Sequence, residues 1–354
     1  MTKAELDSIK ILPLEDSWYR RVKEKLDGIA KPLDGLGKFE HLIAQIGAIE
    51  KTTRISIQKK AVLVMCADNG VVEEQVSQSG KEVTLAVAKA MGVNNSSVGK
   101  MAAVAGVDVI PVDIGIDTDE VIPGVLPRKV AKGTKNFAKE PAMTEEEVLK
   151  AIETGIQLVQ QCHREGYEIL ATGEMGIGNT TTSTAVAAAL LDLEVEQVTG
   201  KGAGLTDEAL KRKCRVIKEA IEKYSLRDAD AFTILKTVGG LDIAGLTGVF
   251  IGAAIEQIPV VIDGVISAVA ALLAETFCKG AVNYMIPSHK SRELAETAIM
   301  KKLHLDPVLD ADMALGEGTG AVMMMSLLDV ALGVYLQGAS FANFEIEQYK
   351  RYEE

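Results

Sequence analysis

The sequence predicts an α/β fold in which helices cover both faces of a parallel sheet. Short apolar runs, typical of buried strands, alternate along the chain with helical patterns, as in βαβ units. At least five strand ends deliver an acid or hydroxyl residue and then glycine. Only 4% of the residues are aromatic, while 32 are glycine. Such a composition suits close packing of helices on a sheet better than an all-β sandwich. The expected strands are residues 60–66, 107–112, 169–171 and 259–262, and residues 284–289 repeat the pattern.

Between these strands the periodicity predicts the helices that would cover the sheet. Thr144 is followed by three glutamates, which is a helix start with a capping residue and early acids. Residues 117–143 are richer in Pro, Gly and Lys and are expected to be irregular. A basic helix is expected after its cap at Thr206, and an apolar helix of small residues after Gly245. The other expected helices of this part of the chain are residues 82–91, 96–105, 144–164, 185–191, 267–277 and 321–336.

The two ends of the chain predict a second, smaller unit. Residues 18–26 form an amphipathic pattern, and residues 39–49 place five apolar side chains on one helical face. The last 20 or so residues are also expected to be helical and to pack with the first 55. We therefore predict a small helical domain from residues 1–55 with 335–354, and a large α/β domain from residues 56–334.

Charge and cysteine content narrow the functional class. The net charge of −12 argues against sequence-independent binding to nucleic acid or to an anionic membrane, because both need a cationic face. The four cysteines lie far apart and indicate buried thiols in a reducing compartment, not a metal site or a disulfide framework. The acidic start does not resemble a signal peptide, and no uninterrupted apolar stretch reaches membrane-spanning length. We expect a soluble, cytoplasmic protein.

Residues 168–184 carry the strongest functional signal. An apolar run breaks at Gly173, passes through a loop with Gly176 and Gly178, and meets a hydroxyl run just before a helix-forming segment. A strand, a glycine loop and a helix N-terminus together form an architecture that binds phosphate. The stretch matches neither the P-loop nor the Gly-x-Gly-x-x-Gly pattern. An ordinary β-to-α turn with capping threonines stays open as the alternative.

Other predicted strand ends and loops have the same character. Carboxylates stand beside glycine at Asp68, Asp113, Asp242, Asp263 and Glu317, in addition to Glu174. For Glu317 the alternative is an acid that merely begins a helix. The chain has no Cys–His couple with catalytic spacing and no Gly-x-Ser-x-Gly elbow, and its four histidines show no metal-ligand spacing and are expected at the surface or in the core. Carboxylates beside phosphate-binding loops suit glycosyl transfer at a ribose, where the transition state is cationic and the nucleophile must lose a proton.

Eight short strings occur in an order that closely resembles the nicotinate-nucleotide:5,6-dimethylbenzimidazole phosphoribosyltransferase family. The resemblance covers almost the whole chain, and the strings at 173–181 and 315–320 are the most specific. The strings are Pro-Leu-Asp-Gly-Leu-Gly at 32–37, Ala-Asp-Asn-Gly at 67–70, Val-Asp-Ile-Gly at 112–115, Gly-Glu-Met-Gly-Ile-Gly-Asn-Thr-Thr at 173–181, Gly-Lys-Gly at 200–202, Gly-Gly-Leu-Asp-Ile-Ala at 239–244, Val-Ile-Asp-Gly at 261–264 and Leu-Gly-Glu-Gly-Thr-Gly at 315–320.

This resemblance implies a reaction, a fold and a set of site residues. A nitrogen of an aromatic base attacks C1′ of nicotinate mononucleotide and nicotinate leaves, in the assembly of the cobalamin nucleotide loop. No cofactor and no metal are implied, and the family is typically a homodimer with a Rossmann-like main domain and a small helical domain. Glu317 matches the family's catalytic base. The residues assigned to substrate binding are Glu174, Gly176, Ile177, Gly178, Asn179, Thr180, Thr181, Gly202, Lys213, Asp242, Asp263, Leu315, Gly316, Ser79 and Lys81, with Gly202, Lys213 and Lys201 on the phosphate side.

The chain departs from the family pattern in one region. Family members usually carry His where this chain has Asn69, and the loop at 76–84 lacks the usual Pro-Gln. Because this region helps to shape the base pocket, the acceptor stays open between 5,6-dimethylbenzimidazole, adenine and a phenol attacked through oxygen. The last would involve a heterodimer with a paralogous subunit. Two further alternatives are a nucleotide-binding enzyme without this transfer, and a non-catalytic partner subunit, against which the presence of Glu317 counts.

Overall fold

The computed structural model describes residues 1–202 and 204–351, and its described residues form one six-stranded sheet. All neighbouring strands run parallel, in the order β3-β2-β1-β4-β5-β6. This is the strand order of dinucleotide-binding Rossmann folds, in which the order reverses between the first and fourth strands. The predicted fold class is confirmed. The strands are β1 (Lys60–Ala67), β2 (Val107–Gly115), β3 (Leu126–Pro127), β4 (Ile169–Met175), β5 (Val260–Ile262) and β6 (Met285–Pro287).

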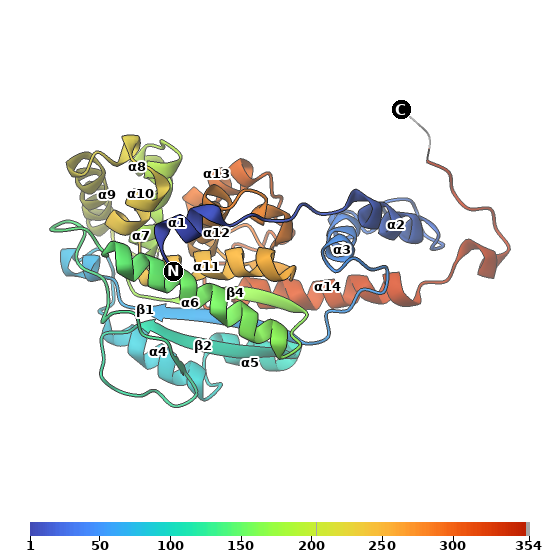
Figure 1. Cartoon of the computed structure of the whole chain (residues 1–354), viewed down its shortest axis with the longest axis horizontal. Coiled ribbons are helices and arrows are strands. Elements are labelled where there is room, and N and C mark those ends of the chain that lie inside the picture. The colour runs from blue at the N-terminus through green and yellow to red at the C-terminus, as the bar shows by residue number, and fades with distance from the viewer. Residues whose placement is uncertain (203, 352–354) are drawn as a thin grey trace.

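Helices cover both faces of this sheet, as Figure 1 shows. One face is packed against α6, α11 and α12, and the other against α4, α5 and α14. The sequence patterns did not indicate α8, α10 or α13. The helices are α1 (Lys3–Ser8), α2 (Asp16–Asp27), α3 (Lys38–Ile49), α4 (Glu82–Gly92), α5 (Ser97–Ala105), α6 (Glu145–Arg164), α7 (Asn179–Leu190), α8 (Val195–Val198), α9 (Asp207–Lys223), α10 (Ala231–Val238), α11 (Leu241–Glu256), α12 (Val265–Phe277), α13 (Leu294–Leu303) and α14 (Thr319–Gln337).

The alternation of side chains along β1 explains why its sequence is apolar from Ala61 to Ala67. Leu63 and Met65 lie in the core beneath α6 and α11, whereas Val62 and Val64 lie in the core beneath α14. Successive side chains of a strand point to opposite faces, so a strand covered on both faces needs apolar residues at every position.

Helix α7 begins at Asn179, earlier than the expected start at residue 185. The hydroxyl run lies inside the helix because its threonines donate hydrogen bonds to the preceding turn. Thr182 Oγ1 donates to the carbonyl of Asn179 at 3.0 Å, and Thr184 Oγ1 donates to the carbonyl of Thr180 at 2.7 Å. Such local bonds allow threonines in a helix interior despite their modest helix propensity.

Helices α2 and α3 pack on each other at one end of the molecule, beside the C-terminal half of α14 (Figure 1). The expectation of a helical C-terminal segment is correct only up to Gln337, where α14 ends. Between residues 338 and 351 the only helical turn is the 3₁₀ turn Phe341–Phe344. Gly338 follows α14 with extended backbone, which ends the helix.

The first residues of the chain pack with the large α/β unit and not with α2 and α3. Leu6 of α1 is fully buried in the core beneath α6 and α11. The amino group of Met1 forms an ion pair with Glu153 of α6 at 2.7 Å, and the Tyr284 hydroxyl donates to the carbonyl of Leu12 at 2.9 Å. The division into two domains stays a prediction, with residues 1–12 on the side of the large unit.

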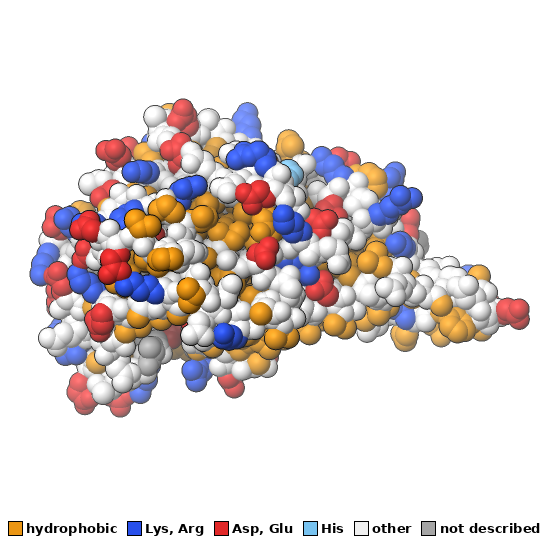
Figure 2. All heavy atoms as spheres, turned by 90° about the horizontal axis from the view of Figure 1, so that it is seen from below, with side chains coloured by type: hydrophobic (Ala, Val, Ile, Leu, Met, Phe, Trp, Pro, Cys, Tyr) orange, Lys and Arg blue, Asp and Glu red, His pale blue; other side chains and the backbone are white. Residues whose placement is uncertain are grey.

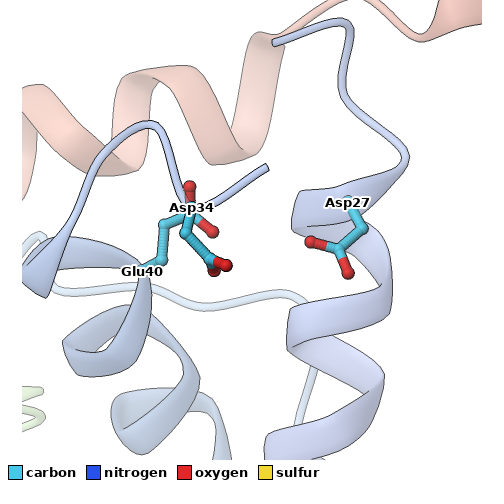
Figure 3. Close-up of side chains that lie close together, drawn as sticks. All are labelled: Asp27, Asp34 and Glu40. Atoms are coloured by element: carbon cyan, nitrogen blue, oxygen red, sulfur yellow. The ribbon is translucent and has the colours of Figure 1, made fainter. Parts of the chain in front are cut away.

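Ion pairs attach the C-terminal segment to the loop between α2 and α3. Asp27 at the end of α2, Asp34 in the loop and Glu40 in α3 lie close together (Figure 3), and each is paired with a cation. Arg351 Nε lies 2.7 Å from Asp27 and Arg351 Nη1 lies 2.7 Å from Asp34, while Lys31 Nζ lies 2.5 Å from Glu40. The segment after α14 therefore folds back onto the α2–α3 pair through charge-assisted hydrogen bonds.

Among the described residues, only α14 is long and apolar enough to cross a membrane by length and composition. Its contacts are those of a core helix, since it packs on β4, β5, α3 and α5. Asp329, in its second half, forms an ion pair with Lys60 at 3.1 Å. This carboxylate interrupts the apolar stretch.

The packing of α6 on α11 predicts a strong effect of Gly248→Ala on stability. A Cβ at Gly248 would lie 2.0 Å from the carbonyl oxygen of Ile152, a backbone atom that cannot move alone. We expect a loss of about 1–3 kcal/mol in the free energy of unfolding, measured by urea denaturation. Gly28→Ala is the control, because a Cβ there meets only ordinary contacts. Equal stability of the two variants would contradict this packing.

Candidate active site

A cavity of about 200 Å³ opens at the carboxyl ends of β4, β5 and β6. In an open parallel sheet ligands bind at this edge, near the point where the strand order reverses. The first turns of α7 and α12 reach the cavity, and their N–H groups and dipoles favour an anion. The lining consists of Glu174, Met175, Gly176, Ile177, Asn179, Thr180, Gly202, Asp263, Gly264, Val265, Ile266, Ser267, His289, Ser291, Glu293, Ala314, Leu315 and Gly316.

The loop between β4 and α7 needs its glycines for two different reasons. Gly178 has a φ of +93°, a conformation that other residues rarely adopt. Gly176 is required by space, because a Cβ would lie 2.6 Å from the carbonyl oxygen of Ala67. Between them, the N–H of Ile177 donates to Thr84 Oγ1 at 3.1 Å. The loop is thus held against the end of β1 and against α4.

Two carboxyl groups share one amide beside the cavity. Asn179 Nδ2 donates to Asp242 Oδ2 at 3.1 Å and also to Glu174 Oε2. Burial raises the pKa of Glu174 to about 8 and that of Asp242 to about 6, while the hydrogen bonds from Asn179 act in the opposite direction. Glu174 therefore keeps its proton to a higher pH than an exposed glutamate does.

Glu317 stands in a turn of three consecutive left-handed residues. Its φ is +60°, between Gly316 at +84° and Gly318 at +88°. A glutamate in this conformation is strained by about 1 kcal/mol and needs support from its surroundings. The carboxylate is half-buried, and its Oε2 accepts a hydrogen bond of 3.0 Å from the N–H of Val98 in the first turn of α5.

Asp263, at the end of β5, is bonded to the start of α14. Its Oδ2 accepts from the N–H of Gly318 at 3.2 Å, and its Oδ1 accepts from the N–H of Ala321 at 3.1 Å. Burial raises the pKa of Asp263, and the neighbouring His289 and the backbone N–H groups oppose that shift. The carboxyl group thus lies at the cavity wall with both oxygens engaged by α14.

The cationic part of the site lies behind the wall formed by α7. Lys213 is fully buried, and its Nζ donates to Thr180 Oγ1 at 3.0 Å and to the carbonyl of Gly200 at 3.1 Å. Burial lowers its pKa to about 8, against the effect of Glu293. Glu293 in turn accepts from the N–H of Gly202 at 3.1 Å. The Lys213 ammonium group therefore lies one hydrogen bond behind Thr180, which lines this end of the cavity.

Comparison with known proteins assigns this architecture to a family. A family profile described as Phosphoribosyltransferase matches residues 11–346. The chain belongs to this phosphoribosyltransferase family. A relative from Acetivibrio thermocellus is 45% identical over 93% of this chain and 94% of its own length, and one from Clostridium acetobutylicum is 43% identical over 95% and 96%. Both relatives are named nicotinate-nucleotide–dimethylbenzimidazole phosphoribosyltransferase.

Solved structures agree with this assignment. The crystal structure of CobT from Thermus thermophilus superposes on this phosphoribosyltransferase with a TM-score of 0.89. It is 33% identical in sequence, and the match covers 94% of this chain and all of that one. The similarity therefore extends over both the sheet and the helices at its end.

The structure brings most of the predicted site residues of the phosphoribosyltransferase to one place. Five predicted residues do not line the cavity but contact lining residues or adjoin them in sequence, namely Gly178, Thr181, Lys213, Asp242 and Glu317. Ser79 and Lys81 are not part of the cavity lining in the described part of the chain, and Lys81 is paired with Asp117. Those that line the cavity are Glu174, Gly176, Ile177, Asn179, Thr180, Gly202, Asp263, Leu315 and Gly316.

Several cavity residues were not predicted. His289 was expected at the surface or in the core, yet it is buried and lines the cavity, with Nδ1 2.9 Å from Ser288 Oγ. The pattern at 284–289 indicates a strand end, and this signal could have identified it. Ser291 and Glu293 follow on the same segment, where no glycine marks a loop. Ser267 comes from the first turn of α12.

The raised pKa of Glu174 predicts a pH-dependent difference in stability between the wild type and Glu174→Gln. Between its ordinary pKa of 4.5 and the folded value of about 8, the folded chain holds a proton that the unfolded chain has released. Stability of the wild type therefore falls as the pH rises through this range, and the glutamine variant lacks this contribution. From pH 5 to pH 8 we expect the variant to gain at least about 1 kcal/mol relative to the wild type.

Urea denaturation at several pH values measures this difference, with Glu140→Gln as the control. Glu140 is exposed on the surface, away from the cavity. A difference between the wild type and Glu174→Gln that stays constant with pH would show that Glu174 is ionised in the folded chain.

Proposed function

We propose that this enzyme transfers the 5-phosphoribosyl group of nicotinate mononucleotide to 5,6-dimethylbenzimidazole, in the assembly of the cobalamin nucleotide loop. The observation that carries the proposal is the near full-length similarity, at 43–45% identity, to enzymes that bear the name of this reaction. The chain covers 94–96% of their length, so the comparison extends over nearly the whole of both relatives.

The charges around the cavity suit the phosphoribosyl donor. Nicotinate mononucleotide carries a phosphate at one end and a cationic pyridinium at the other. The first turns of α7 and α12, with Lys213 behind Thr180, favour the phosphate. Glu174 and Asp242 share the amide of Asn179 on the opposite side, and a cationic ring bound beside them would lower their raised pKa values and favour their charged forms. With Glu317 they favour the positive charge that develops at C1′.

The proposed step makes one bond and breaks one. A ring nitrogen of the base attacks C1′ from the face opposite the pyridinium, the C1′–nitrogen bond to nicotinate breaks, and the bonding pair returns to the pyridine ring. Glu317 accepts the proton of the other ring nitrogen. The leaving ring departs without needing a proton, so a single carboxylate serves as the base.

The other residues predicted to bind substrate, apart from Asp263, keep that role in the proposal. The loop at 176–181, Gly202, Leu315 and Gly316 contact the nucleotide side, and Ser79 and Lys81 belong to the region that would shape the base pocket. Asn69, the departure from the family pattern, is buried against the glycine loop, with Nδ2 3.4 Å from the carbonyl of Ile177. A hydrogen bond from the Asn69 side chain also lowers the pKa of Asp242, so Asn69 can act on the pocket through this carboxyl as well as through the loop.

We also propose that two copies of the chain associate and that the enzyme works in the cytoplasm. Figure 2 shows hydrophobic side chains gathered in the middle of the face seen from below. On the helices α5 and α14, which pack together, Val104 is 91%, Val330 is 73% and Met323 is 41% exposed. Apolar surface of this kind is typical of an interface. The four free cysteines suit a reducing compartment.

Turnover of nicotinate mononucleotide tests the function and the role of Glu317. The purified enzyme with 5,6-dimethylbenzimidazole should release nicotinate, and Glu317→Gln should lower kcat by about 10²–10⁴-fold because the base is lost. Chromatography of nicotinate and of the ribotide product measures both. Asp312→Asn is the control, since Asp312 is exposed on the same segment.

Adenine and phenol, assayed separately, distinguish the acceptor class. Release with phenol alone would reassign the acceptor, and no release with any of the three would contradict the function of the isolated chain. A Glu317→Gln variant within twofold of the wild type would remove Glu317 from the role of base.

Association is tested by sedimentation equilibrium. We expect a species of two 37.8 kDa chains, and Val330→Lys should shift it toward the monomer by placing a charge in the apolar surface. Leu12→Lys, on the opposite side of the sheet, should leave the mass unchanged. A monomeric wild type that is inactive alone would instead indicate a paralogous partner subunit.

A further inference from the structure

Helix α14 receives its N-terminal cap from a distant part of the chain. The residue at its own N-cap position, Gly318, has no side chain to bind the free N–H groups of the first turn. Asp263 takes this role from the end of β5, 55 residues earlier, with one oxygen on the N–H of Gly318 and the other on the N–H of Ala321. A carboxylate at a helix N-terminus satisfies unpaired donors and interacts favourably with the helix dipole.

This cap fixes the backbone of Glu317. The N–H that Asp263 Oδ2 accepts belongs to the peptide group joining Glu317 to Gly318, and it follows directly after the strained left-handed glutamate. On the other side, the carbonyl of Glu317 lies against Gly173, where a Cβ would come within 2.6 Å of its oxygen. The peptide after Glu317 is therefore clamped between the ends of β4 and β5.

The surroundings of Asp263 hold its carboxyl group in this orientation. Asp263 is only 2% exposed. The Ser288 hydroxyl donates to the carbonyl of Asp263 at 3.3 Å, and His289 packs against the first turn of α14. A Cβ at Gly320 would lie 2.0 Å from His289 Nδ1 and 3.0 Å from Asp263 Oδ1, so these groups fit together only around a glycine.

We propose that Asp263 is a positioning residue for Glu317 and not a ligand of the substrate. It lines the cavity, but both its oxygens are used by α14, and its effect on the reaction passes through the placement of the Glu317 carboxylate. The inference rests on the proposed function, in which Glu317 takes a proton from the acceptor. A base displaced by about 1 Å loses much of its efficiency while the binding of the donor is kept.

The test is Asp263→Asn, assayed for kcat, for KM and for binding of nicotinate mononucleotide by titration calorimetry. Asparagine offers one acceptor oxygen in place of two, so one of the two N–H groups loses its partner. We expect kcat to fall about 10²-fold, with KM and Kd for nicotinate mononucleotide within about twofold of the wild type.

Two further variants separate positioning from folding. Asp230 caps α10 in the same way, on the N–H groups of Phe232 at 2.9 Å and Thr233 at 3.1 Å, outside the cavity lining. Asp230→Asn should lower Tm as Asp263→Asn does but leave kcat unchanged. Gly320→Ala keeps the Asp263 carboxylate and pushes the start of α14 away from it, and it should reproduce the selective loss of kcat.

Three results would overturn the proposal. A Kd for nicotinate mononucleotide weakened tenfold or more in Asp263→Asn would make Asp263 a substrate ligand. If Asp263→Asn had the same kcat as Asp230→Asn, Asp263 would be a structural cap and not a positioning residue. A wild-type enzyme that binds nicotinate mononucleotide but transfers it to no acceptor would end the proposed function, and this inference with it.

Discussion

The backbone of Glu317 lies directly on the carboxyl end of β4, and the geometry of the whole site depends on this contact. Gly173 of β4 approaches the Glu317 carbonyl so closely that a Cβ would lie 2.6 Å from the oxygen. From the other side, a Cβ at Gly318 would lie 2.6 Å from Val62 Cγ2 of β1. Two glycines thus allow the segment before α14 to rest on the sheet at the point where the strand order reverses. The Glu317 side chain, next to the cavity-lining Gly316, is thus carried by a rigid backbone, and its carboxylate accepts from the N–H of Val98.

The same edge of the sheet concentrates negative charge in a chain that is already acidic. Glu174 and Asp242 share the amide of Asn179, and Asp263 lies beside Glu317. Burial raises the pKa values of Glu174, Asp242 and Asp263, so part of the negative charge is neutralised by bound protons. The cationic ring of the donor would act as the counter-charge that these carboxyl groups lack. The phosphate, in contrast, is met by helix N-termini and by a lysine behind them.

The sequence predicts the sheet well because each buried strand has apolar residues on both faces, as the alternation at Val62 and Leu63 shows. It also predicts that acids after the strands converge, since parallel strands deliver their carboxyl ends to one edge. The start of α7 was misplaced because threonine is a weak helix former in isolation, whereas here Thr182 and Thr184 bond to the preceding turn. The strand-end pattern at 284–289 places His289 at the right edge of the sheet, but its packing against Gly320 of α14 depends on a distant segment that this pattern does not encode. The path of residues 1–12 depends likewise on a distant partner, Glu153.

The glycines of the site also decide between the two interpretations of the loop after β4. An ordinary β-to-α turn needs glycine only where φ is positive, as at Gly178. Gly176 and Gly320 have no such φ. A Cβ at Gly176 would lie 2.6 Å from the carbonyl oxygen of Ala67 and 2.8 Å from Asp242 Oδ2, and a Cβ at Gly320 would lie 2.0 Å from His289 Nδ1. A simple turn does not require glycine backbone to pack tightly against a carboxylate or an imidazole. It arises where polar side chains are brought together around a ligand, and this favours a binding loop over a simple turn.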